Sequence, residues 1–265
     1  MTTSALRPNA RHVPAMMMAT LFVAVAMGAA RAAQAPPPTV VMGDLARRDI
    51  RVPESVPNFS GTWITLTSDR TMAPLDGGTT PFQPWARELF ETRGNLERSG
   101  VPQFDPNANC VPPGLPRWLE VPFGFEIVQT ADKMFFLSEI MHSFRVIHMD
   151  GKPKPADYKP SDYGWSVGTW DGDMLVVETT GLNGFTPSDI EGRAKSTQMR
   201  VVERLRKVAP DQLEDTFTLY DPLTYTRPWT SRARFAWHPE ARIQEYICEE
   251  NNRNRTDPTG TQRGR

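Results

Sequence analysis

The chain has 265 residues, of which 39% are apolar and 9% aromatic, and its formal net charge is −1. This apolar content is enough to build a core and excludes general disorder. The near-zero charge argues against nucleic acid as a partner, because proteins that bind it usually carry a basic excess. The 25 prolines argue against an all-helical bundle, since proline interrupts helices.

The first 35 residues have the organisation of a secretory signal peptide. A basic start with Arg7 and Arg11 precedes an apolar run over 15–30, and the small residues that follow offer cleavage sites after Ala33 or Ala35. The alternative is a membrane anchor, for which the run is short, because a spanning helix needs about 20 residues. We therefore predict a signal peptide over residues 1–35, a periplasmic or secreted protein, and no transmembrane segment once the signal is removed.

Two cysteines, Cys110 and Cys248, remain after the predicted cleavage. An even pair in an oxidising compartment predicts a disulfide, which would stabilise the fold by about 4–5 kcal/mol on the chain-entropy model. The alternative is two buried free thiols. The bridge would tie down the Pro-rich segment over 100–122, which we expect to cover one end of the domain.

The predicted elements begin with a strand over 59–67, FSGTWITLT. A helix is predicted over 84–98, because proline stands at its start and Trp85, Leu89 and Phe90 recur at helical spacing. Further strands are predicted from their apolar and alternating residues over 125–130, 134–140, 143–149, 163–170, 174–180, 198–208, 212–220, 232–237 and 242–248.

Many links between these strands are short and carry turn residues, among them Asp150-Gly151 and Asp171-Gly172-Asp173. Short links join antiparallel neighbours, because parallel strands need long crossovers. The predicted fold class is therefore all-β, an antiparallel up-and-down barrel or a strongly curved meander, with one helix. We expect a single domain over 58–252, after a Pro-rich extended lead-in over 36–57 and before a polar tail over 253–265.

Two resemblances follow from these segments. The opening Gly61-Thr62-Trp63 resembles the first strand of lipocalin and calycin barrels. The segments CVPPGLPRW, GWSVGTWDGDMLVVETTGLN, DPLTYTRPWT and EYICEENN are similar to a widespread family of secreted bacterial proteins, over about residues 58–252. That resemblance implies export and a single compact domain, and it supplies no catalytic residues to carry over.

Several acids share a strand face with apolar residues, which predicts carboxylates directed into the domain. A buried carboxylate needs a partner, and groups in such surroundings are the usual source of general acids and bases. Arg145 is the candidate partner, and Arg145 or His142 would steady charge. The alternative is that these acids form solvated or structural ion pairs. The candidate catalytic residues are Glu139, Glu178, Glu203, Glu245, Arg145 and His142.

The sequence predicts neither a metal nor a cofactor. His142 and His148 share parity, but residues six apart on a strand lie about 20 Å apart and cannot bind one ion without a bend. The chain lacks the glycine-rich phosphate loops and the G-x-S-x-G motif.

We predict an exported protein that binds a small apolar or aromatic molecule in a barrel cavity, because tryptophan often lines such cavities. Trp229 in particular is expected in a loop at the cavity mouth. One alternative is a cofactor-free isomerase, lyase or hydrolase that uses the buried carboxylates, and another is an envelope interaction protein without a small-molecule site. The candidate ligand-binding residues are Trp63, Trp165, Trp170, Trp229, Phe135 and Met199.

Overall fold

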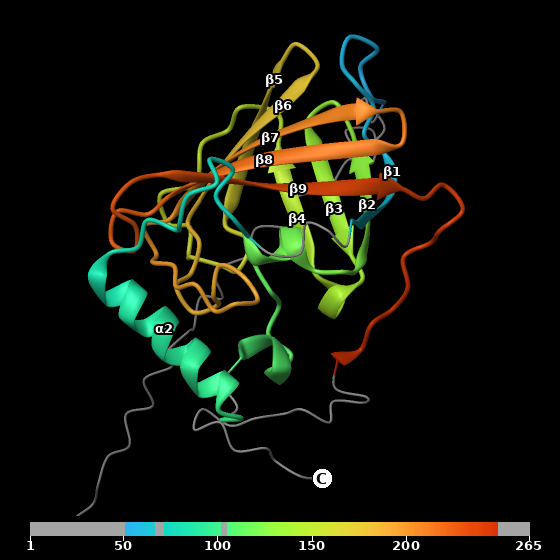
Figure 1. Ribbon diagram of the computed structural model, residues 1–265. Coiled ribbons are helices and arrows are strands. Elements are labelled where there is room, and N and C mark those ends of the chain that lie inside the picture. Colours follow the sequence, from blue (N-terminus) through green and yellow to red (C-terminus); the bar gives the residue numbers. More distant parts are fainter. Residues whose placement is uncertain (1–50, 67–71, 102–104, 249–265) are drawn as a thin grey trace, which may run out of the picture. The chain divides into compact units, whose positions relative to one another are not determined.

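The computed structural model describes residues 51–66, 72–101 and 105–248 (Figure 1). The predicted signal peptide and the polar tail over 253–265 lie outside these residues. The described part contains one α-helix, α2 (Pro84–Arg98), and nine strands. The strands are β1 (Gly61–Thr65), β2 (Gly124–Gln129), β3 (Lys133–Ser138), β4 (Phe144–His148), β5 (Trp165–Asp171), β6 (Met174–Thr180), β7 (Arg200–Ala209), β8 (Gln212–Tyr220) and β9 (Trp229–Trp237).

The strands form a closed barrel in sequence order, which confirms the predicted fold class. Closure is made by β1, which pairs with β2 on one side and with β9 on the other, where Trp63 lies opposite Trp237. Consecutive strands such as β5 and β6 are joined by tight turns, with Gly172 at a φ of 63° that suits glycine.

One pair departs from the expected antiparallel arrangement. Strands β4 and β5 run parallel, with Ile147 opposite Ser166 and His148 opposite Val167. The link over 149–164 is long enough to carry the chain back to the start of the next strand, which a parallel neighbour requires. Asp150-Gly151 therefore begins a long connection rather than a hairpin.

The strand predicted over 242–248 is wrong. This segment is irregular and mostly exposed. The physical reason is closure: β9 already pairs with β8 and β1, so the barrel offers no free edge to a further strand.

The barrel interior is filled by alternate side chains from every strand. Buried and half-buried residues alternate without a break along β8, whose pattern places Leu213, Asp215, Phe217 and Leu219 inside. The largest fully buried side chains of the inner face include Trp63, Phe125, Ile127, Met134, Phe136, Phe217 and Phe235. Where these side chains lie, the interior of the barrel is therefore a packed core.

Helix α2 has the bounds that its sequence predicts, with Pro84 at its first turn. It lies beside the barrel, and the loop over 183–197, which links β6 to β7, lies between them in Figure 1. Trp85 Nε1 donates to the carbonyl oxygen of Leu223 at 2.8 Å, and Arg93 Nη1 donates to that of Gly192 at 3.0 Å. These bonds attach α2 to two loops at one end of the barrel.

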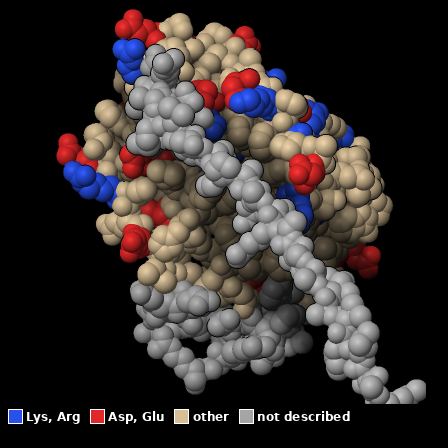
Figure 2. Space-filling model, turned by 180° about the vertical axis from the view of Figure 1, so that it is seen from behind, with Lys and Arg blue, Asp and Glu red and all other residues tan. Residues whose placement is uncertain are grey.

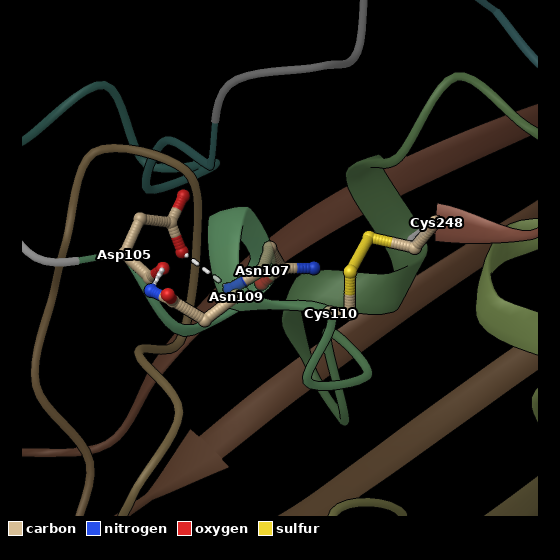
Figure 3. Close-up of a disulfide and its surroundings, with 5 residues drawn as sticks. All are labelled: Asp105, Asn107, Asn109, Cys110 and Cys248. Carbon is tan, nitrogen blue, oxygen red and sulfur yellow. Dashed lines mark hydrogen bonds between the residues drawn. A yellow bond between two sulfur atoms is a disulfide. The ribbon is translucent and has the colours of Figure 1, made fainter. Parts of the chain in front are cut away.

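The disulfide between Cys110 and Cys248 is present, with 5.6 Å between the two Cα atoms (Figure 3). Trp118 follows Cys110 in the same Pro-rich segment. It packs edge-on against Phe125 and Phe136, with ring centroids 4.8 and 5.8 Å away. Both phenylalanines belong to the inner face of the barrel. The Pro-rich segment thus covers one barrel end, as expected.

Acidic and basic side chains are interspersed on the face of the protein shown in Figure 2. The ion pair between Arg200 and Glu178, at 2.9 Å, also lies on the protein surface. Within residues 51–66, 72–101 and 105–248, no helix has the length and apolar character needed to cross a membrane.

Candidate functional site

A charged cluster lies inside the barrel, between strands that are not neighbours. Arg145 of β4 donates through Nη1 and Nη2 to the two carboxylate oxygens of Glu203 of β7, with 2.7 Å between Nη1 and Oε1. Its remaining donors reach Thr179 Oγ1 at 2.9 Å and Ser166 Oγ at 3.1 Å. Because β5 and β6 separate β4 from β7, these side chains meet by crossing the barrel interior.

Asp215 of β8 adds a second acid to this cluster. Burial, and then the charge of Glu203, raise the pKa of Asp215 well above its usual value. The charge of Arg145, which is paired with Glu203, opposes this rise. Since Arg145, Glu203 and Asp215 are all buried, the cluster is suited to holding strands together rather than to meeting a ligand.

Glu178 has the same apolar-face pattern as Glu203 but lies on the outer surface. Its side chain is 55% exposed and pairs with Arg200. On β6 the inner face belongs to Leu175, Val177 and Thr179, which are buried. The expected inward direction of Glu178 is therefore wrong, because both faces of this strand carry apolar residues and parity cannot tell them apart.

Three further predicted residues lie outside the barrel interior. The Glu139 carboxylate accepts the backbone N–H of Gly124 at 3.1 Å and that of Gln244 at 3.0 Å, so it fastens the C-terminal segment to the barrel. Glu245 is exposed in that irregular segment, and His142 is exposed in the turn before β4. Neither shares a contact with Glu203.

Of the aromatic candidates, Trp63 and Trp229 belong to the core. Trp63 is fully buried in β1, and its Nε1 donates to the carbonyl oxygen of Phe59 at 2.9 Å. Trp229 is the first residue of β9 and packs edge-on against Tyr225, so the prediction that it lies in a loop is wrong. The strand extends back to it because Trp229 pairs with Leu219 of β8.

The other ligand-binding candidates are dispersed. Trp170 packs on Phe59, Met199 is buried just before β7, and Phe135 is half-buried on the outer face of β3. Trp165 stacks on His148 with 3.9 Å between ring centroids. These residues do not surround one cavity.

Trp165, His142 and Arg145 do line a hollow of about 450 Å³ beside β4 and β5. The donors of Arg145 are directed into the barrel cluster, however, and leave the hollow without a free cation from this side chain. The hollow is therefore a weak candidate for a ligand site.

A cavity of about 360 Å³ lies between α2 and two loops, 105–117 and 184–195, and we call it the α2 cavity. Apolar side chains of α2 and of the 184–195 loop form its walls. Three of these side chains, Trp85, Phe185 and Ile190, are about half exposed. The volume falls within the range of small-molecule sites. Charged residues line it as well, namely Arg93, Glu97, Asp105, Arg117, Glu191 and Lys195. The apolar walls are made by Trp85, Leu89, Phe185, Pro187 and Ile190.

Lys195 is a buried cation of the α2 cavity. The residue is only 5% exposed. Its Nζ donates to the carbonyl oxygen of Leu115 and to Thr186 Oγ1, each at 2.8 Å. Burial lowers the pKa of Lys195 to about 7, because desolvation disfavours the ammonium form. At neutral pH, a lysine with such a pKa populates both its charged and its neutral form.

The wall formed by the 105–117 loop is braced by an ion pair. Arg117 donates through Nη1 and Nη2 to the two carboxylate oxygens of Asp105, each at 2.8 Å. Asp105 also accepts the backbone N–H of Asn107 at 2.9 Å, at the start of the short turn that ends at Cys110 (Figure 3). The disulfide therefore anchors one wall of the cavity.

Beside the cavity lies a second charged group, in which Arg193 and Asp189 are buried and Glu191 is exposed. Arg193 donates to both Asp189 and Glu191, and its guanidinium lies 4.9 Å from the centre of the Phe90 ring of α2. Glu120 is almost fully buried nearby. Burial, and then the charge of Asp189, raise the pKa of Glu120 to about 9.

We expect Glu120→Gln to remove part of the pH dependence of stability. The folded state holds a proton on Glu120 between pH 4.5 and about 9, where the unfolded state releases it. Glu120 therefore contributes a fall in wild-type stability of about 1.4 kcal/mol for each pH unit of increase in this window, and the neutral amide removes that contribution. Urea unfolding at pH 6 and pH 8 measures it, with the exposed Glu178→Gln as the control. An unchanged slope in Glu120→Gln would contradict the assignment.

Sequence reasoning missed Lys195, Arg117 and Glu120 because all three lie outside the strands. Loops carry no hydrophobic period from which burial could be inferred. The available signals were the Pro-rich composition of 100–122 and the long interval between β6 and β7, since long loops in a small domain are often functional.

Comparison with known proteins adds no relative: no family model matches the chain, and no curated protein matches it. Within the described part of the chain, no group of three or more His, Cys, Asp or Glu residues is placed to hold a metal ion. The site must therefore be interpreted from its own chemistry.

Proposed function

We propose that this is an exported protein that binds a small molecule with an apolar or aromatic body and one oxygen-bearing polar group. The observation that carries the proposal is the α2 cavity, which is lined by both a group of apolar side chains and a buried lysine. Export is supported by the Cys110–Cys248 disulfide, because such bonds persist in oxidising compartments. The ligand site of this proposal lies beside the barrel rather than within it, since inner side chains fill the barrel core.

The cavity chemistry supports this class of ligand. An aromatic body would contact Trp85, Leu89 and Ile190, which already lie partly exposed around the opening. A carboxylate or carbonyl oxygen would meet Lys195, whose ammonium form is stabilised by a bound anion. The rigid wall at Arg117 limits the cost of ordering the site on binding.

Naphthalene-2-carboxylate is a suitable probe, because it combines an aromatic body with one carboxylate. We expect calorimetric titration to give saturable binding with one probe per chain. Ile190→Glu should weaken this binding about tenfold, because it removes an apolar contact and places a negative charge beside the probe.

The matched control is Leu75→Glu. Leu75 is 47% exposed and Ile190 is 52% exposed, both lie outside regular elements, and Leu75 is not part of the α2 cavity. Leu75→Glu should bind the probe as the wild type does. Equal binding by wild type and Ile190→Glu, or no saturable binding by the wild type, would disprove the proposal.

A further inference from the structure

We propose that Lys195 is a nucleophilic amine that captures an aldehyde or ketone in the α2 cavity as an imine. The inference rests on the proposed binding function and names the chemical class of its ligand. It is carried by geometry: Lys195 lines the cavity, and its buried amine has only neutral hydrogen-bond acceptors.

Lys195 differs from the other buried cations of the protein. Lysine is almost never buried unless it is paired, because desolvation of the charge is costly. Within the described residues, Lys195 has no ion pair. Three buried arginines each bind a carboxylate: Arg117 binds Asp105, Arg145 binds Glu203 and Arg193 binds Asp189.

The hydrogen bonds of Lys195 suit the neutral amine. A neutral amine has two N–H groups and one lone pair, and Nζ has two acceptors, Leu115 O and Thr186 Oγ1. The lone pair is then not engaged. Burial favours this form most, the charge of Arg117 adds to it, and the charge of Asp162 opposes it. Lysines desolvated in this way serve as Schiff-base nucleophiles.

The reaction is an addition followed by loss of water. The Nζ lone pair attacks the carbonyl carbon, a C–N bond forms, and the carbonyl oxygen becomes a hydroxyl group as it takes one proton from nitrogen. The second nitrogen proton then leaves with that hydroxyl as water, and a C=N bond forms. One amine and one carbonyl compound thus give one imine and one water, with no oxidant or reductant.

The test uses 2-naphthaldehyde, which has the aromatic body of the binding probe, together with sodium cyanoborohydride, which reduces the imine to a stable secondary amine. Peptide mass spectrometry then locates the adduct. We expect one naphthylmethyl group per chain on Lys195, formed at pH 7 at least tenfold faster than on Lys207, a more exposed lysine at the barrel end. An excess of naphthalene-2-carboxylate should suppress the adduct on Lys195 and leave that on Lys207 unchanged.

Lys195→Arg is the matched variant, because it keeps a cation and cannot form an imine. It should lose the fast adduct at position 195, while the adduct on Lys207 forms as in the wild type. Should this variant fail to fold, mapping of the wild type decides alone. Adducts on Lys207 and other surface lysines, with Lys195 unmodified in a protein that binds the carboxylate, would overturn the inference and leave the binding function standing. Absence of carboxylate binding as well would overturn both.

Discussion

We expect Arg145→Met to lower the free energy of unfolding by about 3–5 kcal/mol, because it leaves two buried acids without their cation. Glu203 loses the donors that bind both of its carboxylate oxygens, and Asp215 loses the positive charge that lowers its pKa. Both effects destabilise the folded state when the acids are ionised. Urea unfolding of the purified variant at pH 7 measures the loss.

The control for Arg145 is Arg200→Met. Arg200 also pairs with a glutamate, Glu178, but this pair lies on the surface, and its loss should cost less than about 1 kcal/mol. Equal losses in the two variants would show that the inner cluster is not a buried ion pair.

Two further measurements separate charge from packing. The double variant Arg145→Met/Glu203→Leu should be more stable than Arg145→Met, because it removes one of the two uncompensated carboxylates. The single variant should also lose less stability at pH 5 than at pH 8. Because the pKa of Asp215 is raised, the folded state takes up protons as the pH falls. Removal of the positive charge of Arg145 raises this pKa further, so protonation at pH 5 offsets part of the lost stability.

We expect Cys110→Ser/Cys248→Ser to lower the free energy of unfolding by about 4–5 kcal/mol. The two cysteines are 138 positions apart in the sequence, and the loop that they close contains every strand from β2 to β9. Without the bridge, the unfolded chain recovers the conformational freedom of this whole loop. Urea unfolding of the variant under non-reducing conditions measures the difference.

Reduction of the wild type provides the control. Dithiothreitol should lower the stability of the wild type towards that of the double variant and leave the double variant unchanged. Because Cys110 follows directly on the turn that Asp105 caps, the double variant should also bind naphthalene-2-carboxylate more weakly. A wild type whose stability is insensitive to complete reduction would contradict the predicted contribution of the bridge.

Glu178 of β6 and Glu203 of β7 show what strand periodicity can and cannot predict. Each shares a strand face with apolar residues, and both were candidates on that ground. The barrel places Glu203 inside, against Arg145, and Glu178 outside, against Arg200. Parity identifies which residues share a face, but the direction of that face depends on how the sheet curves and closes.

The α2 cavity is a product of tertiary structure alone. Lys195, Arg117 and Trp85 lie far apart in the chain, on two loops and one helix, and they line one cavity because both loops pack at the same end of the barrel. No local pattern in the sequence encodes this convergence. Burial changes the chemistry of Lys195 only once the segments have come together.

Local patterns were sufficient wherever the structure depends on neighbours in sequence. The alternation of apolar residues determined most strands, proline and helical spacing determined α2, and the cysteine pair indicated the bridge, because each expresses short-range backbone geometry or the chemistry of two residues. The tertiary structure decided the remainder: closure between β1 and β9, the parallel pairing of β4 with β5, the irregular 242–248 segment and the burial of Lys195. These features arise from contacts between distant segments, whose energies depend on the whole fold.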